Sequence, residues 1–87
     1  MNFSHAYEYL NAGDVVKVLL DSQANVRLID SSNFASFQCG SNFEYFGGLA
    51  KRSPAILRVP YSGMWHIVID LGGYAGSVNY SIQVVKS

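Results

Sequence analysis

Two stretches near the C-terminal end of the sequence carry its clearest alternation of apolar and polar residues. Residues 64–71 place an apolar side chain at every odd position, and residues 78–84 alternate throughout. A period of two residues is typical of a strand with one buried face. The segment 72–76 between them is rich in glycine, which tolerates the positive φ values of tight turns. The pattern therefore predicts a β-hairpin over residues 62–85.

Four shorter apolar runs predict further strands, and two of these runs are expected to pair. The runs at residues 15–20 and 24–29 alternate and are separated by a short polar connector, so we expect them to form a hairpin. Residues 43–46 predict a short strand that ends at Gly47. Residues 55–59 lie between two prolines, which cannot donate to a sheet ladder, and they predict another strand.

Two segments predict helical turns. In residues 2–12, the side chains of Phe3, Tyr7 and Leu10 have helical spacing, so a short turn is expected there. Residues 33–39 follow Asp and Ser residues that can cap a helix, and they precede a glycine that can end one. A single helical turn is predicted for this segment.

Taken together, the pattern predicts one all-β domain over residues 1–87. About six short strands with turn signals between them, and one or two helical turns, favour a single small antiparallel β-sandwich or a jelly-roll-like barrel. Trp65 begins the most apolar strand face, and we expect it in the core. A chain of this size buries only about 60% of its unfolded surface or slightly more, so its core must use apolar residues efficiently.

The composition narrows the choice of partners and compartment. Charged residues make up 14% of the chain, against about 25% in soluble proteins generally, so an apolar contact surface is expected. The formal net charge is zero and no basic run occurs, which argues against nucleic acid or a membrane as a partner. The sequence shows a single cysteine, no secretory leader and no membrane-spanning apolar stretch. These features predict a cytoplasmic protein, bacterial or released by a phage into its host.

His66 and Asp70 share one face of a predicted strand and are the first candidates for chemistry. Four strand residues separate their Cα atoms by roughly 13 Å, too far for a direct hydrogen bond. We expect two polar residues on a solvated or loop-covered face, with Asp70 accepting N–H groups of the glycine turn. Cys39 has no base beside it and is expected to be a buried or half-buried structural cysteine.

Metal and phosphate sites are not predicted either. Asp14, Asp21 and Asp30 lie near turns without the alternating spacing of a calcium loop, so we expect them to cap turns. The glycines of residues 72–76 precede a strand pattern, whereas a phosphate loop opens a helix. The sequence therefore predicts no catalytic residue, no metal ligands and no cofactor.

Aromatic residues make up 14% of the chain, more than a core of this size needs. Several lie at predicted strand ends or turns, where a partly exposed ring can stack on a sugar, a base or a partner's side chain. The alternative is that these rings cover the ends of the sandwich. The candidate binding residues are Tyr74, Gly72, Gly73, Tyr45, Phe46, Tyr61, His66 and Asp70.

The segments GDVVKV, ANVRLIDSSNF, YFGG, SPAILRVP and GMWHIVIDLGGYAGSV together resemble a bacterial family, domain of unknown function 1883, from Phe3 to Val85. The resemblance implies a small stand-alone protein or a domain attached to a Toll/interleukin-receptor (TIR) domain in bacterial immune proteins. It brings no activity. In that family the segment after the short helix tends to be basic, whereas this chain has QCGSN at residues 38–42. The order of strands and turns also resembles pre-peptidase C-terminal domains and related carbohydrate-binding sandwiches, which implies a non-catalytic binding module.

Three functions are compatible with these observations. The leading hypothesis is a non-enzymatic interaction module that self-associates into a homo-oligomer or docks on a protein partner. The alternative is a small-molecule binder, for a glycan or a nucleotide-like immune signal, linked to bacterial defence or phage counter-defence. An enzyme that uses His66 or His5 comes last, because the residue spacing does not support a hydrolase-like site.

Overall fold

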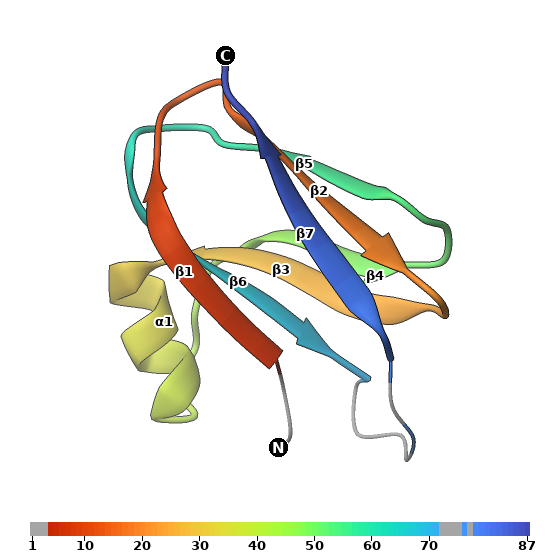
Figure 1. Cartoon of the computed structure of the whole chain (residues 1–87). Helices are drawn as coiled ribbons and strands as arrows, with labels where there is room; N and C mark the ends of the chain where they lie inside the picture. The colour runs from red at the N-terminus through yellow and green to blue at the C-terminus, as the bar shows by residue number, and fades with distance from the viewer. Residues whose placement is uncertain (1–3, 72–75, 77) are drawn as a thin grey trace.

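The computed structural model describes residues 4–71, 76 and 78–87, and over these residues seven strands and one helix build two packed sheets (Figure 1). All strand pairs are antiparallel. The predicted all-β sandwich is therefore confirmed. In chain order the elements are β1 (Ser4–Leu10), β2 (Val15–Leu20), β3 (Ala24–Asp30), α1 (Ser31–Gln38), β4 (Phe46–Ala50), β5 (Ala55–Arg58), β6 (Gly63–Asp70) and β7 (Tyr80–Val85).

The strand order differs from the order that the sequence suggests. One sheet has the order β1-β6-β3-β4 and the other has the order β5-β2-β7. Both predicted hairpins are wrong, because β2 and β3 lie in different sheets, as do β6 and β7. β3 alternates between buried and half-buried residues as far as Leu28 and Ile29, which are both buried, and β6 is buried from Ile67 to Asp70. Burial also alternates along β2 and β7, with exposed residues in both. The two central strands of the four-stranded sheet are therefore the most deeply buried, and α1 helps to cover Ile29 and Val68 on their outer face.

The connector between β2 and β3 crosses from one sheet to the other. Its first residue, Asp21, accepts hydrogen bonds from the backbone N–H of Asn79 at 2.9 Å and from its side-chain amide at 2.8 Å. Asn79 directly precedes β7, so this clamp ties the crossing to the start of the last strand. These bonds join segments 58 residues apart, so the predicted turn-capping role of Asp21 stays a prediction.

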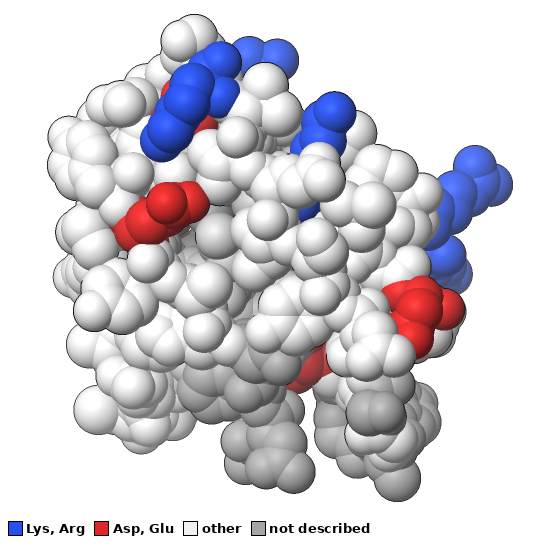
Figure 2. Space-filling model, in the orientation of Figure 1, with Lys and Arg blue, Asp and Glu red and all other residues white. Residues whose placement is uncertain are grey.

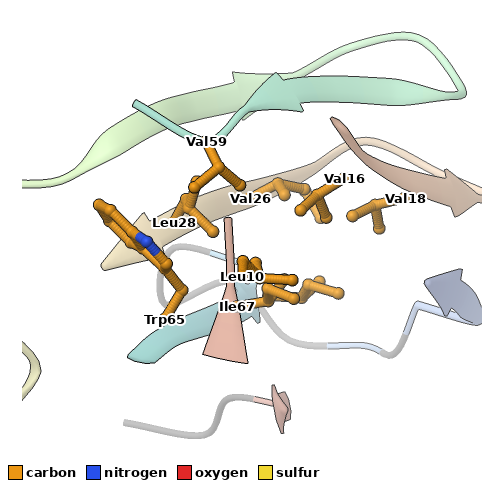
Figure 3. Packing of buried hydrophobic residues seen from close by; sticks show 10 residues of the cluster. Leu10, Val16, Val18, Val26, Leu28, Val59, Trp65 and Ile67 are labelled. Carbon is orange, nitrogen blue, oxygen red and sulfur yellow. The ribbon is translucent and has the colours of Figure 1, made fainter. Parts of the chain in front are cut away.

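The main core lies between the two sheets (Figure 3). Trp65 is 1% exposed, and its indole Nε1 donates to the carbonyl oxygen of Tyr61 at 2.9 Å. The ring is thus buried with its one polar atom bonded, and the predicted core position of Trp65 is confirmed. The buried aliphatic residues around it are Leu10, Val16, Val18, Ala24, Val26, Leu28, Val59, Ile67 and Ile69.

The helix α1 covers part of the outer face of the four-stranded sheet. Asp30 caps it by accepting the backbone N–H of Asn33 at 2.8 Å, and Gly40 follows its end with a φ of 76°. Phe34 is 6% exposed and packs with Ile29 and Val68 as a second, smaller core. The predicted helical segment is confirmed and begins two residues earlier, at Ser31 rather than Asn33, because Asp30 is the cap.

Two other predictions for local structure are wrong. The segment 2–12 contains β1 instead of a helical turn. Leu10 lies on the face of β1 that points inward and is fully buried in the main core. The strand predicted for residues 43–46 instead begins at Phe46 and continues through Gly47. A Cβ on Gly47 would lie 2.3 Å from the carbonyl oxygen of Val26, and its φ is 110°, so glycine serves close strand packing here and does not end the strand.

Candidate interaction surface and its polar centre

The alternate residues His5, Tyr7 and Tyr9 form a row of rings along the outer face of β1, which we call the β1 row. All three side chains are exposed, Tyr7 by 62% and Tyr9 by 56%. β1 is an edge strand, and in its register with β6 Tyr7 lies opposite His66 and Tyr9 lies opposite Met64. Met64 is 39% exposed. An apolar strip therefore follows the open edge of the four-stranded sheet.

Sequence analysis missed the β1 row because it assigned helical spacing to this segment. The signal was available in the sequence. His5, Tyr7 and Tyr9 occupy alternate positions, and the neighbouring Leu10 is in phase with the opposite face. A period of two fits these residues as well as a helical period fits Phe3, Tyr7 and Leu10, and a stretch this short does not decide between them.

His66 joins three elements through hydrogen bonds to its two ring nitrogens. Its Nδ1 lies 2.7 Å from Nε2 of His5 on β1, and its Nε2 lies 3.1 Å from Oγ of Ser31 at the start of α1. Sequence analysis named His66 and His5 separately but predicted neither their contact nor the role of Ser31. The three residues are distant in sequence, and they meet because β6 pairs with β1 on one side and with β3, which leads into α1, on the other.

Phe34 forms an apolar floor beneath both imidazoles. Its ring stacks on His66 with centroids 4.1 Å apart and on His5 with centroids 4.4 Å apart. The two imidazoles are nearly parallel, at 10°. Burial and, less strongly, the charge of neighbouring His5 lower the pKa of His66 below its usual value, against an opposing effect of Asp30. The site therefore favours a neutral imidazole at position 66.

A serine hydroxyl beside an imidazole is the first half of a nucleophile and base pair. In this site the other nitrogen of His66 faces a second imidazole, which cannot compensate a positive charge as a carboxylate does. The described polar contacts of Ser31 and His66 serve equally well to fasten β1 and β6 to the start of α1. The geometry thus gives His66 a clear structural role at the junction of three elements.

Asp70 lies on the same outer face of β6 but has different partners. It is 3% exposed, pairs with the guanidinium of Arg27 and accepts from the amide of Asn25 at 3.0 Å. Both partners are on the neighbouring strand β3. The predicted bonds from Asp70 to the glycine turn fall on a segment that the structure does not describe. The predicted solvated setting is wrong for Asp70, which is buried beside these partners, and the alternative of a loop-covered face stays a prediction.

Phe46 and Tyr61 both pack against Trp65. Both rings contact Trp65, with centroid distances of 5.9 Å and 4.8 Å, and both remain partly exposed, at 45% and 47%. The Tyr61 hydroxyl donates to the carboxylate of Asp30. This bond raises the pKa of Tyr61 and lowers the pKa of Asp30, to which the backbone of Asn33 also donates. The two rings cover the edge of Trp65 and also present an aromatic surface to solvent.

Tyr45 is separate from that pair. Its ring contacts Phe43 at 5.5 Å, and the guanidinium carbon of Arg27 lies 5.3 Å from the ring centroid, a cation–π geometry. Tyr45 is 43% exposed. The candidates Gly72, Gly73 and Tyr74 lie outside the described residues, so their predicted role in binding stays a prediction.

A shallow apolar groove lies where the edges of the two sheets meet, between β4 and β5. Its volume is about 190 Å³, below the roughly 300 Å³ at which sites for drug-sized ligands begin. Its floor includes the close approach of Gly47 to Val26, and the nearby Leu49 and Ile56 are 55% and 60% exposed. The lining residues are Val26, Gly47, Gly48, Leu49, Ala50, Ala55, Ile56 and Leu57.

Charged side chains are sparse on the face that Figure 2 shows, with wide uncharged surface between them. Among the described residues, no group of three or more His, Cys, Asp or Glu side chains gathers as a metal site would. Asp14 accepts backbone N–H groups of Asn11 and Ser87, at 2.9 and 3.0 Å, as a turn cap does. These bonds lower its pKa. No described helix has the length and apolar character needed to cross a bilayer.

Cys39 is exposed, so the prediction of a buried or half-buried cysteine is wrong. The residue is the C-cap of α1, and it follows the part of the helix that packs on the sheet. Its backbone N–H donates to the carbonyl oxygen of Ala35 at 3.1 Å. The main chain of Cys39 thus ends the helix while its side chain faces solvent.

A family model described as domain of unknown function (DUF1883) matches residues 1–87, the whole chain. The comparisons with curated proteins and with solved structures gave no match.

Proposed function

The chain belongs to the family of domain of unknown function DUF1883, and from that premise we propose that it is a non-enzymatic interaction module that binds protein surfaces, its own included. The observation that carries this proposal is the β1 row. Tyr7 and Tyr9 expose more than half of their surface along an open sheet edge. Tyrosine is enriched at the centres of protein interfaces because it buries a large apolar area and keeps one polar group.

The ion pairs and hydrogen bonds of the titratable groups support a structural role for these groups in place of a catalytic one. Asp70 is paired with Arg27, and Asp30 caps α1 while accepting the hydroxyl of Tyr61. His66 fastens β1 to α1. A general acid or base needs a pKa suited to proton transfer and access to a substrate, whereas these groups are held by partners within the fold.

The proposal is tested by comparing two tyrosine variants on different sheets. Tyr9→Ser removes a ring from the β1 row, and Tyr80→Ser removes a ring that is 39% exposed on β7. Light scattering across a dilution series and affinity capture measure binding to self and to other proteins. We expect Tyr9→Ser to lose association at least tenfold while Tyr80→Ser keeps it. The proposal would be overturned if the wild-type protein stays monomeric and Tyr9→Ser still captures every protein that wild type captures.

Binding of a small molecule is the second proposed function, and the exposed rings of Phe46 and Tyr61 favour it. Two partly exposed rings that pack on the same tryptophan offer stacking surfaces for a glycan or a nucleotide-like signal. Native mass spectrometry of freshly purified protein would reveal a bound molecule, and Tyr61→Ala should release it. The association with TIR domains, the role in bacterial defence or phage counter-defence, and the cytoplasmic location remain predictions.

A further inference from the structure

The open edge of β1 differs from two other sheet edges. β1 pairs with β6 along all seven residues, from Ser4 opposite Ile69 to Leu10 opposite Gly63, in an unbroken register. Alternate residues of an antiparallel edge strand direct their N–H and C=O groups away from the partner strand. In the described chain no strand pairs with β1 on its other side. The open edge therefore offers backbone bonds to an added strand.

Natural sheets protect such edges with prolines, lysines, bulges or very short strands. β5 has four residues and lies between Pro54 and Pro60. β4 contains Gly47 and Gly48 with φ values of 110° and 144°, which distort that edge. β1 has the sequence SHAYEYL, without proline, glycine, lysine or arginine, and Glu8 is its one acidic residue. Its outer face carries the β1 row, whereas alternate residues of β7 include the polar Ser81 and Gln83.

The residue pattern of β1 is self-complementary in one antiparallel register. Residues that face each other across antiparallel strands project on the same face of the sheet, so a two-fold axis must pass through a residue position. An axis at Glu8 would set two carboxylates opposite each other. An axis at Ala6 would pair only residues 4–8 of β1 with one another and would set Tyr9 opposite position 3, outside the described strand. An axis at Tyr7 pairs every residue of β1 and sets Glu8 opposite Ala6.

We propose that β1 binds β1 of a second copy of this chain in antiparallel orientation about Tyr7, which joins the two four-stranded sheets into one continuous sheet across a two-fold dimer. This inference rests on the proposed function and names the partner and the register. Tyr7 faces Tyr7 of the second copy, and His5 faces Tyr9 of the second copy. The two β1 rows become one aromatic row on a common face, and cross-strand aromatic pairs are among those that stabilise sheets. Such a contact is isologous, so it closes at two copies.

A charge-swap experiment tests this register. Tyr7→Lys places two ammonium groups opposite each other across the axis, and Tyr7→Glu places two carboxylates there. We expect wild type to dimerise reversibly in light scattering, each variant to be monomeric at concentrations where wild type is dimeric, and an equal mixture of the two variants to recover heterodimers. Ser81→Lys on β7 is the matched control and should dimerise like wild type. Circular dichroism checks that each variant keeps its fold.

A crosslinking experiment covers the case in which the charged variants fail to fold. In a Cys39→Ser background, Tyr7→Cys should form an intermolecular disulfide under mild oxidation, because facing Cα atoms about 4.5–5.5 Å apart suit one. Glu8→Cys should crosslink at least tenfold more slowly, because the same residue of the two copies would be offset to roughly 8 Å.

The outcomes distinguish failure of the proposed dimer from failure of the proposed function as an interaction module. A monomeric wild type at millimolar concentration overturns the dimer, while Tyr9-dependent capture of another protein would leave the interaction module standing. A dimer that survives both charged variants shows self-association through another surface and overturns β1 as the interface. Monomeric variants that fail to recover heterodimers, or equal crosslinking at positions 7 and 8, overturn the Tyr7 register.

Discussion

Replacing Trp65 by alanine tests whether the end of the sandwich depends on one ring. Trp65 is 1% exposed and contacts both Phe46 and Tyr61, so the substitution removes a large buried side chain and the floor under two partly exposed rings. Truncation of a buried tryptophan costs about 3–5 kcal/mol. The carbonyl oxygen of Tyr61 also loses its indole donor, which adds about 1 kcal/mol unless water replaces it. The expected loss is therefore about 4–6 kcal/mol.

The consequence is large because small domains have only about 5–15 kcal/mol of stability in total. Urea unfolding followed by far-ultraviolet circular dichroism measures the loss, since the substitution removes the chain's one tryptophan and with it the natural fluorescence probe. With a slope of about 1–2 kcal/mol per molar urea, the midpoint should fall by roughly 2–6 M. A folded Trp65→Ala protein with a loss under about 2 kcal/mol would refute the assignment of Trp65 as the anchor of the core.

Trp65→Phe separates ring packing from the hydrogen bond. The smaller ring retains contact with Phe46 and Tyr61 but cannot donate to the Tyr61 carbonyl oxygen. We expect a loss of about 1–2 kcal/mol, mainly from the unmade bond and a small cavity. If Trp65→Phe were as damaging as Trp65→Ala, the hydrogen bond and not the packing would dominate, and the reasoning above would be wrong.

Two further predictions concern charged groups on the outer face. Because the pKa of His66 is lowered in the fold, the unfolded chain binds more protons than the folded chain between that lowered pKa and about 6.5, so the free energy of unfolding should fall as pH drops through this window. Urea titrations at pH 7.5 and 5 measure this change in the free energy of unfolding. The same change with pH in His66→Phe would count against the prediction. Arg27→Met should lower the free energy of unfolding by about 3 kcal/mol, because it removes the guanidinium that pairs with the buried Asp70 carboxylate. Adding Asp70→Leu should restore much of the lost stability. Calorimetry of the single and double variants measures both effects, and additive losses would contradict the prediction.

Local periodicity in the sequence determined most of the secondary structure. The alternation at residues 15–20, 24–29 and 64–71 predicts strands that the structure contains. The polar segment before Phe34 predicts the capped helix. These features depend on backbone dihedrals and on which face of each element is apolar, and both leave a mark in consecutive residues. The core position of Trp65 follows from the same pattern.

Tertiary structure decided which strands pair. A three-residue polar connector fits a hairpin and also fits a crossing between two sheets, because both leave the period-two pattern unchanged. The choice depends on tertiary packing, because α1 covers Ile29 of β3 and Val68 of β6 and no pattern within either strand records that contact. Gly47 shows the same limit, since its glycine serves a close approach to Val26 that no local pattern records.

The candidate surface was only partly predictable for the same reason. Surplus aromatic residues and low charge indicated an apolar contact surface, and Phe46 and Tyr61 do expose their rings. The contacts of His66 with His5 and Ser31 join residues up to 61 positions apart. A side chain's type and face are local properties that the sequence determines. Its neighbours depend on strand order and register, which are fixed only when the two sheets close around their shared core.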